Sequence, residues 1–242
     1  MRKTMLITAG ILIIFFAAGF VMFQVNTTPT HPLATGRIVP GVYAVAGQIV
    51  DVFLLRDGDD YLAIDAGDNP APISAGLHRL RVDPRKVTVL LLTHSDYDHV
   101  AGLNLFPRAA VYLGTREEAM LDGKVARMFG LVRNQKLNRP YRLLDDGQVL
   151  KIGNFQVKAI ATPGHTYGST SYLINNQYLF TGDTIALQEG KAKLFHWFNY
   201  SDSLEARSIA KLAGLHDIKL MCTAHTGDTK DFTEALRAWR KK

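Results

Sequence analysis

The feature that most restricts the fold of this chain is a buried-strand pattern that ends directly in a cluster of potential metal ligands. Residues 87–92 are all valine, threonine or leucine, which is typical of a strand covered on both faces. The next seven residues contain His94, Asp96, Asp98 and His99. Loops that leave strand ends commonly carry reactive groups, and mixed imidazole and carboxylate ligands suit zinc, iron or manganese. The pattern therefore predicts a metal site at the end of a buried strand.

Three further potential ligands occur in the same context. His165, Asp183 and His225 each follow a predicted strand and lie close to a glycine or proline. A single histidine in such a place is more often structural, but the same context at four places favours a metal site. One rim of the fold can gather all seven side chains.

The remaining pattern indicates two series of strands, each accompanied by helices. Short strands are predicted at residues 42–45, 50–55, 61–64, 110–113, 149–152, 155–160, 171–174, 178–180 and 218–222. Helices are predicted at residues 72–80, 201–212 and 231–239, and another begins at Thr115 behind a possible capping box. Residues 122–140 show no pattern that assigns a structure. The order favours an α+β fold of αββα type, in which two sheets lie between outer helices.

The N-terminus predicts membrane attachment. Residues 5–23 contain no charge and follow Arg2 and Lys3, and a bilayer core needs about 20 apolar residues in a helix. We expect a transmembrane helix within residues 1–24, a linker at 25–36 and a folded domain at 37–242. The basic residues before the run predict that the domain lies outside the cytoplasm, periplasmic or extracellular. Secretion after cleavage of a signal peptide is the alternative, although no small-x-small cleavage site is evident.

Composition excludes one class of partner. The formal net charge of +6 includes Arg2 and Lys3, and no dense basic block interleaved with aromatic residues follows them. This argues against binding to nucleic acid and leaves a small molecule as the expected substrate. The single cysteine, Cys222, lies in an apolar run, which predicts a buried thiol.

The ordered motifs resemble the metallo-β-lactamase superfamily over about residues 37–242. The resemblance rests on the seven potential ligands, and Asp65-Ala66-Gly67, Thr162-Pro163-Gly164-His165-Thr166 and Phe180-Thr181-Gly182-Asp183 support it. It implies a four-layer αββα sandwich that holds two divalent metal ions, with zinc expected. By the same resemblance, His94, Asp96 and His165 hold the first ion, Asp98, His99 and His225 hold the second, and Asp183 bridges both.

Asp96 departs from the pattern of this family, which usually has a second histidine at that position. A carboxylate adds negative charge and a harder oxygen ligand, so iron or manganese becomes possible; flavodiiron proteins of this superfamily place a glutamate there and hold iron. We expect the added charge to raise the pKa of water between the metals. Aspartate is also shorter than histidine, so ligation by Asp96 stays an open question at this point.

The expected activity is hydrolysis of an ester, thioester, lactone or amide bond. A metal-bound hydroxide would attack the substrate, while Asp98 would orient this nucleophile and carry its proton to the leaving group. Tyr97, Tyr167 and residues 196–200 are candidates for the substrate mouth, with packing as the alternative. Two other functions are considered: a mononuclear-iron oxidoreductase of the persulfide dioxygenase type, which would use fewer ligands, and a non-catalytic metal-binding module, as in relatives that have lost ligands.

Overall fold

The computed structural model describes residues 28–240. The predicted transmembrane helix and the first residues of the predicted linker lie outside this range. Within residues 28–240, no helix is both long and apolar enough to cross a bilayer. Membrane attachment therefore stays a prediction.

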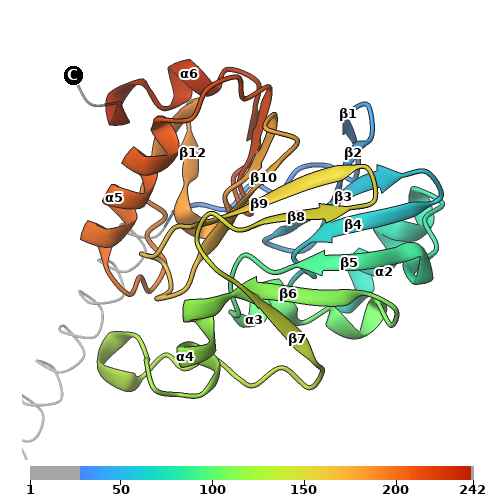
Figure 1. The fold of residues 1–242 in the computed structure, drawn as a ribbon, viewed down its shortest axis with the longest axis horizontal. Helices are drawn as coiled ribbons and strands as arrows, with labels where there is room; N and C mark the ends of the chain where they lie inside the picture. The colour runs from blue at the N-terminus through green and yellow to red at the C-terminus, as the bar shows by residue number, and fades with distance from the viewer. Residues whose placement is uncertain (1–27, 241–242) are drawn as a thin grey trace, which may run out of the picture.

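Two mixed sheets form the centre of the fold (Figure 1). The first contains, in spatial as well as chain order, β1 (Gly36–Val39), β2 (Val42–Ala46), β3 (Asp51–Asp57), β4 (Asp60–Ile64), β5 (Val87–Leu91), β6 (Ala110–Gly114) and β7 (Tyr141–Leu144). Its strands are antiparallel from β1 to β4 and parallel from β4 to β7. Parallel pairing needs crossover connections, and these carry the first helices and the loop after β5.

The second sheet comes from the other half of the described chain. Its strands are β8 (Val149–Ile152), β9 (Phe155–Ala161), β10 (Thr170–Ile174), β11 (Tyr178–Phe180), β14 (Leu220–Cys222) and β15 (Asp228–Thr229), in the spatial order β15-β14-β11-β10-β9-β8. Strands β12 (Ala186–Gln188) and β13 (Lys191–Lys193) form a separate ribbon. Strand β10 is antiparallel to both β9 and β11, and β11 is parallel to β14. Consequently β9, β11 and β14 run in one direction and end at the same edge.

The helices cover the outer faces of the two sheets. They are α2 (Pro70–Arg79), α3 (Tyr97–Val100), α4 (Glu118–Leu121), α5 (Asp202–Ala213) and α6 (Phe232–Ala235). Helix α2 starts where Asn69 Oδ1 accepts the backbone N–H of Ala71, and α5 starts where Ser201 Oγ accepts that of Leu204. In Figure 1, α5 and α6 lie beside the second sheet, and α2 lies against the first sheet.

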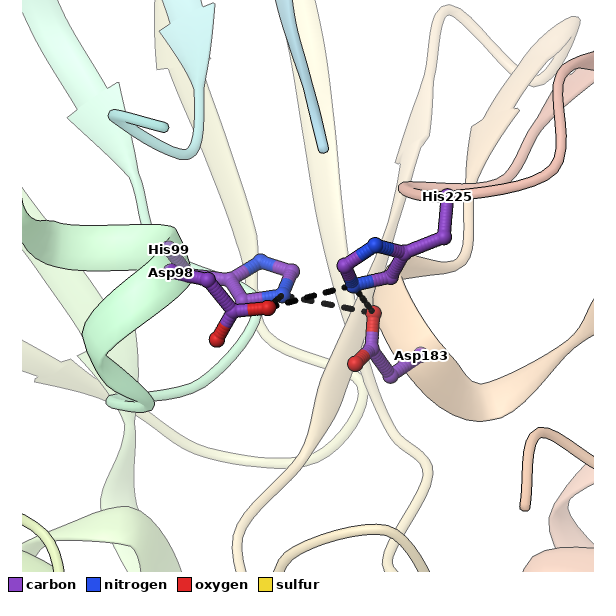
Figure 2. Close-up of side chains that lie close together, drawn as sticks. All are labelled: Asp98, His99, Asp183 and His225. Atoms are coloured by element: carbon purple, nitrogen blue, oxygen red, sulfur yellow. Dashed lines mark ion pairs between the residues drawn. The ribbon is translucent and has the colours of Figure 1, made fainter. Parts of the chain in front are cut away.

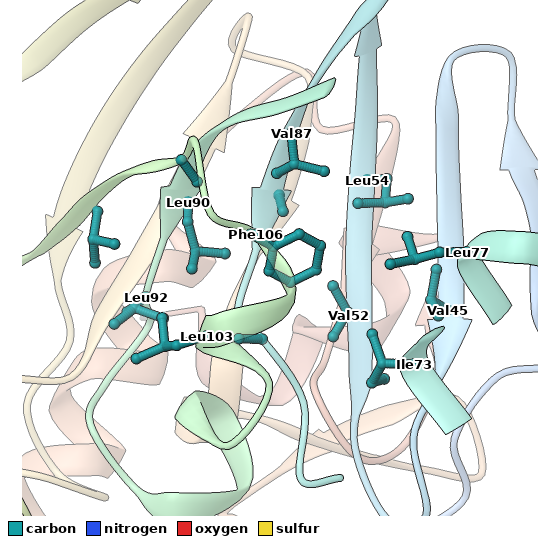
Figure 3. Close-up of a cluster of buried hydrophobic side chains, with 14 of the residues drawn as sticks. Val45, Val52, Leu54, Ile73, Leu77, Val87, Leu90, Leu92, Leu103 and Phe106 are labelled. Atoms are coloured by element: carbon teal, nitrogen blue, oxygen red, sulfur yellow. The ribbon is translucent and has the colours of Figure 1, made fainter. Parts of the chain in front are cut away.

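Three apolar clusters separate the layers. The first joins Leu54 and other residues on the outer face of the first sheet to Ile73 and Leu77 of α2 (Figure 3). The second lies between the sheets and includes Phe53 and Tyr172. The third joins the outer face of the second sheet to α5 and α6. Neighbouring residues 53 and 54 face different clusters because side chains alternate along a strand, so both sheets are buried on both faces and the predicted αββα order is confirmed.

Some elements differ from the sequence predictions. The helix predicted at residues 231–239 is broken into α6 and a 3-10 turn, Arg237–Trp239, and the helix expected from Thr115 is a 3-10 turn, Thr115–Glu117, followed by the short α4. The predicted capping box is wrong, because the Thr115 hydroxyl donates to Asp145 at 2.7 Å instead of capping the helix. Strands β1, β7, β12, β13 and β15 were not predicted; they are two to four residues long, too short to show a clear period.

The described part of the predicted linker packs onto the domain. Thr28 is buried, and its carbonyl oxygen accepts the indole N–H of Trp197 at 2.9 Å. The backbone N–H of His31 donates to the carbonyl of His225 at 2.6 Å. Packing therefore begins before residue 37, where the domain boundary was predicted, because polar loop residues there satisfy hydrogen-bonding groups of the domain.

Candidate metal centre

All seven predicted ligands converge at one edge of the two sheets. His94 follows β5, and Asp98 and His99 lie on α3, directly after it. Asp96 precedes α3 as its N-cap residue, and the remaining three, His165, Asp183 and His225, follow the ends of β9, β11 and β14. Gly182, with a φ of 54°, lets the β11 loop approach β5 closely, since a Cβ there would lie 2.6 Å from the side chain of Thr93.

One group of four ligands can surround a single ion. Asp98, His99, Asp183 and His225 offer atoms that all lie within 4.8 Å of one another (Figure 2). His99 Nε2 lies 3.7 Å from Asp98 Oδ2 and 3.3 Å from Asp183 Oδ1. His225 Nε2 lies 3.4 Å and 3.2 Å from the same two oxygens. Four ligands about 2.1 Å from a tetrahedral zinc ion would be roughly 3.4 Å apart, so this spacing fits a metal.

The ligands expected for the first ion form another group, which shares Asp183. His94, His165 and Asp183 also offer atoms within 4.8 Å of one another. Here Asp183 uses its other oxygen: Oδ2 lies 3.8 Å from His94 Nε2 and 3.4 Å from His165 Nε2. One carboxylate thus presents one oxygen to each group, which is the arrangement of a bridging ligand.

Asp96 lies beside the first-ion group, which consists of His94, His165 and Asp183. Its Oδ2 lies 3.6 Å from His94 Nε2, within the spacing of the other ligands, and 3.0 Å from His165 Nε2, at hydrogen-bond distance. Its Oδ1 is bound elsewhere: Arg127 Nη2 donates to it at 2.5 Å and Asn134 Nδ2 at 2.7 Å. The negative charge expected at this position is therefore paired with a guanidinium from the segment that the sequence left unassigned.

The four histidines are all held in the same orientation. Each uses Nδ1 for a contact with the protein and directs Nε2 toward the centre. The Nδ1 contacts are His94 with Thr93 Oγ1 at 3.0 Å, His99 with Asp65 Oδ2 at 2.9 Å, His165 with Asn199 Oδ1 at 2.9 Å and His225 with the Ile49 carbonyl at 2.6 Å. These acceptors hold a proton on Nδ1 and aim Nε2 at the centre, where it can bind a metal; among the four, only in His165 does Nε2 also have hydrogen-bond partners, Asp96 and Arg127.

The polar atoms at the centre have the properties of metal ligands. The Nε2 atoms of His94, His99 and His225, together with Asp183 Oδ1, are buried and have no hydrogen-bond partner among the described residues. Burial by itself lowers the pKa of His99, but Asp183, Asp65 and Asp98 hold that pKa well above its usual value. A site that favours positive charge and leaves buried acceptors unpaired fits divalent cations.

Two buried carboxylates support the ligand loops from behind. Asp65 accepts the backbone N–H and the hydroxyl of Thr93, at 2.7 and 2.8 Å, as well as His99 Nδ1. Glu117 contacts two ligand loops: Oε1 accepts the backbone N–H and hydroxyl of Ser95, while Oε2 accepts Thr166 Oγ1 and the backbone N–H of Gly168. The sequence prediction placed Glu117 only inside the Thr115-to-Glu118 capping box and missed this role, which no local pattern indicates.

A cavity of about 450 Å³ opens onto the ligands and is lined by Asp96, Asp98, His165 and Asp183. Residues 132–139 form a continuous part of its wall. Tyr97, Trp197 and Phe198 also line it, which agrees with the predicted substrate mouth. Tyr167 does not: it lies in a separate cavity of about 470 Å³ that contains none of the seven ligands, where it packs under Arg116.

A buried glutamate supports His165 through Asn199 and predicts a pH effect on stability. Asn199 Nδ2 donates to Glu205 Oε2, while burial raises the pKa of Glu205 from 4.5 to about 9 against the opposing N–H of Phe195. Between these two values, the folded state binds more protons than the unfolded state. The free energy of unfolding should therefore fall as pH rises through this window, by at most about 1.4 kcal/mol per pH unit from this group.

The contribution of Glu205 to the pH dependence of stability is the difference between the free energies of unfolding of wild type and Glu205→Gln at each pH. Urea unfolding of the metal-free proteins from pH 5 to pH 9 should give a shallower decline for Glu205→Gln. Glu189→Gln, a change at an exposed carboxylate between β12 and β13, should follow wild type. Parallel profiles for wild type and Glu205→Gln would show that Glu205 is ionised in the folded state across this range.

The fold and the site define a class: a four-layer αββα protein whose histidine and aspartate side chains at one sheet edge could hold metal ions. The model of the metallo-beta-lactamase superfamily matches residues 45–240. The chain therefore belongs to the metallo-beta-lactamase superfamily, as the sequence motifs predicted.

Individual relatives are more distant. The probable polyketide biosynthesis zinc-dependent hydrolase BaeB of Bacillus velezensis is 35% identical over 133 residues, which cover 54% of this chain and 52% of BaeB. The hydroxyacylglutathione hydrolase of Yersinia enterocolitica is 30% identical over 178 residues, covering 72% of this chain and 61% of the relative. The chain thus spans about half to two thirds of these relatives.

A solved structure supports the same fold. A B3 metallo-beta-lactamase with an active site glutamic acid superposes with a TM-score of 0.65 at 23% identity, covering 87% of this chain and 90% of the other. At this level of identity the match shows the fold alone.

Proposed function

We propose that this protein is a metal-dependent hydrolase that holds two divalent ions, zinc in the first instance, and cleaves an ester or thioester bond in a small molecule. The observation that carries the proposal is the division of Asp183 between two ligand groups beside an open cavity. The names of the relatives add support, because one is a zinc-dependent hydrolase and another acts on an acylglutathione, which is a thioester.

The residues of the chain divide the work of hydrolysis. Bound divalent ions supply an acidified water and a Lewis acid for the substrate carbonyl. Of the two carboxylates in the group of Asp98, His99, Asp183 and His225, Asp98 is the more open to the cavity, with a side chain 24% exposed compared with 3% for Asp183. Its carboxylate is therefore placed to hold a proton from the attacking water and deliver it to the leaving group.

The cavity wall favours a substrate with an apolar body and an anionic group. Tyr97, Trp197 and Phe198 provide aromatic surface, while the wall from residues 132–139 brings Arg133 and Lys136 to the same space. An acyl group can pack on the aromatic side chains, and a carboxylate of the substrate can meet the basic side chains. Lactones and amides stay within the proposed chemistry, since the attacking group is the same.

The presence of all four residues expected around the second ion, Asp98, His99, Asp183 and His225, favours this proposal over the mononuclear-iron alternative. An oxidoreductase with one iron would need only one set of ligands, whereas both sets are assembled around Asp183. A non-catalytic module would not require a carboxylate such as Asp98 to face a cavity. We therefore place hydrolysis first.

Metal removal tests the proposed activity. Protein treated with a chelator should lose its activity on ester and thioester substrates, and added zinc should restore that activity. Iron and manganese should be added to separate samples for comparison. Asp98→Asn should lower kcat by about 10²–10⁴-fold, the usual contribution of a proton-transfer group. Undiminished turnover by the chelated protein, with its metal content shown to be zero, would refute the proposal.

We also propose that the N-terminal run anchors the domain outside the cytoplasm. The support is the uncharged stretch at residues 5–23 behind Arg2 and Lys3. The full chain should sediment with membranes, and a chain lacking residues 1–24 should be released. Protease added to cells with a permeabilised outer layer and an intact cytoplasmic membrane should cleave the domain. Complete protection under those conditions would place the domain on the cytoplasmic side.

A further inference from the structure

The buried Arg127 occupies an unexpected place in the metal centre. Its side chain is 3% exposed, and Nη1 lies 3.2 Å from His165 Nε2, the atom that should bind the first ion. His165 Nδ1 donates to Asn199 Oδ1, and Nε2 lies between Arg127 Nη1 and Asp96 Oδ2, which is 3.0 Å away. The guanidinium therefore lies against the nitrogen that a metal requires.

The partner of Arg127 is the unusual ligand of the site. Nη2 donates to Asp96 Oδ1 at 2.5 Å, while Asp96 Oδ2 faces His94 and His165. Asn134 Nδ2 bridges Asp96 Oδ1 and Ser95 Oγ, at 2.7 and 2.8 Å, and so fixes the carboxylate from a third side. The pair of Asp96 and Arg127 carries no net charge, like the neutral histidine that the superfamily usually has.

The two ion positions consequently differ in charge. The second position faces Asp98 and Asp183. Among the described residues, these two carboxylates form ion pairs with histidines and with no lysine or arginine. The first position faces Asp96 and the shared Asp183, but a guanidinium lies against its histidine. A divalent ion there meets a like charge at short range, and electrostatic repulsion weakens its binding.

We propose that Arg127 sets the affinity of the first metal position, competing with the ion for His165 and neutralising Asp96, so that the second position fills first. This inference rests on the proposed two-ion site. It replaces the expectation that Asp96 adds an uncompensated negative charge. Filling the first position requires Nη1 to leave His165 Nε2 while Nη2 keeps Asp96.

Metal binding measured without substrate tests this role. Zinc titration of metal-free wild type, followed by calorimetry and by metal content after dialysis, should give one tight and one weak ion per chain. Arg127→Ala should tighten the weak ion by about 10–100-fold, the usual range for a residue that acts on a metal ligand. Arg127→Lys, which keeps the charge but lacks the planar fork, should fall between them.

Further variants assign the ions to positions. In a His225→Ala background, or in Asp98→Ala if that variant folds better, the second position is disabled and the remaining ion reports the first. Adding Arg127→Ala should tighten that ion, and adding Asp96→Asn should release it. Lys124→Ala removes an exposed positive charge from the same segment and should leave both affinities unchanged.

Three results would overturn the inference or its basis. If Arg127→Ala weakens the first ion, Arg127 only positions Asp96 as a ligand. If the variant changes neither affinity, Arg127 has no influence on the metal. Absence of tight zinc binding at either position in wild type would instead refute the proposed two-ion function, and this outcome is distinguishable because it does not depend on Arg127.

Discussion

Replacement of Asp183 by alanine is expected to release both metal ions and to lower kcat/KM by on the order of 10³-fold or more. The reason is geometric: Oδ1 lies 3.2 Å from His225 Nε2 and 3.3 Å from His99 Nε2, while Oδ2 lies 3.4 Å from His165 Nε2. No other carboxylate of the described chain serves both groups. Loss of the ions removes both the activation of water and the stabilisation of the oxyanion.

Asp183→Asn is the matched control for shape. An amide offers one oxygen and one NH2 group, so it can bind one ion but cannot bridge two. We expect Asp183→Asn to keep a single ion in the second position and to lose most activity. Metal content and kcat/KM should be measured on the same preparations. Two tightly bound ions in Asp183→Ala would rule out the bridging role.

The second large effect is expected on stability, from Glu117→Ala. Glu117 is fully buried, and its two oxygens accept four hydrogen bonds, from Ser95 on one side and from Thr166 and Gly168 on the other. Removing the carboxylate leaves buried donors without partners, and each costs about 1–3 kcal/mol unless water reaches it. We expect a loss of about 3–5 kcal/mol in the free energy of unfolding, with weaker metal binding because both ligand loops move.

Urea denaturation of the metal-free proteins measures this loss directly. Glu118→Ala, at the next and partly exposed position, should change the free energy of unfolding by less than about 1 kcal/mol. Glu117→Gln should be intermediate, because its amide NH2 group faces donors instead of accepting from them. A wild-type unfolding midpoint for Glu117→Ala would mean that Glu117 does not hold the two loops together.

The local pattern along the chain predicted most strands because alternation and apolar runs are properties of neighbouring residues. The run before His94 became β5, buried between β4 and β6, and the segment around Cys222 became β14 with a buried thiol, as predicted. Burial raises the pKa of the Cys222 thiol well above its usual value, which agrees with a structural role. Short edge strands were missed because two to four residues cannot show a period.

The sequence also predicted which side chains meet. Ligands that follow β5, β9, β11 and β14 share one edge because strands that run in one direction end together, and this follows from strand order. The assignment of these residues to metal binding stays a prediction until ions are measured. Tyr167 lines a separate cavity that contains none of the seven ligands, although His165, two residues earlier, lines the cavity at the metal centre.

By itself, the sequence determined the superfamily, through the resemblance of its ordered motifs. It also determined the layers and the residues that converge at the candidate metal centre, because these depend on local periodicity and on ligand chemistry. Only the tertiary structure decided the charge at that centre. Arg127 and Asn134 lie 31 and 38 residues from Asp96 along the chain, and Glu117 lies 49 residues from Thr166. The sequence around these residues contains no pattern that predicts their partners, because the partner of a buried charge depends on packing across the fold and not on neighbours in sequence.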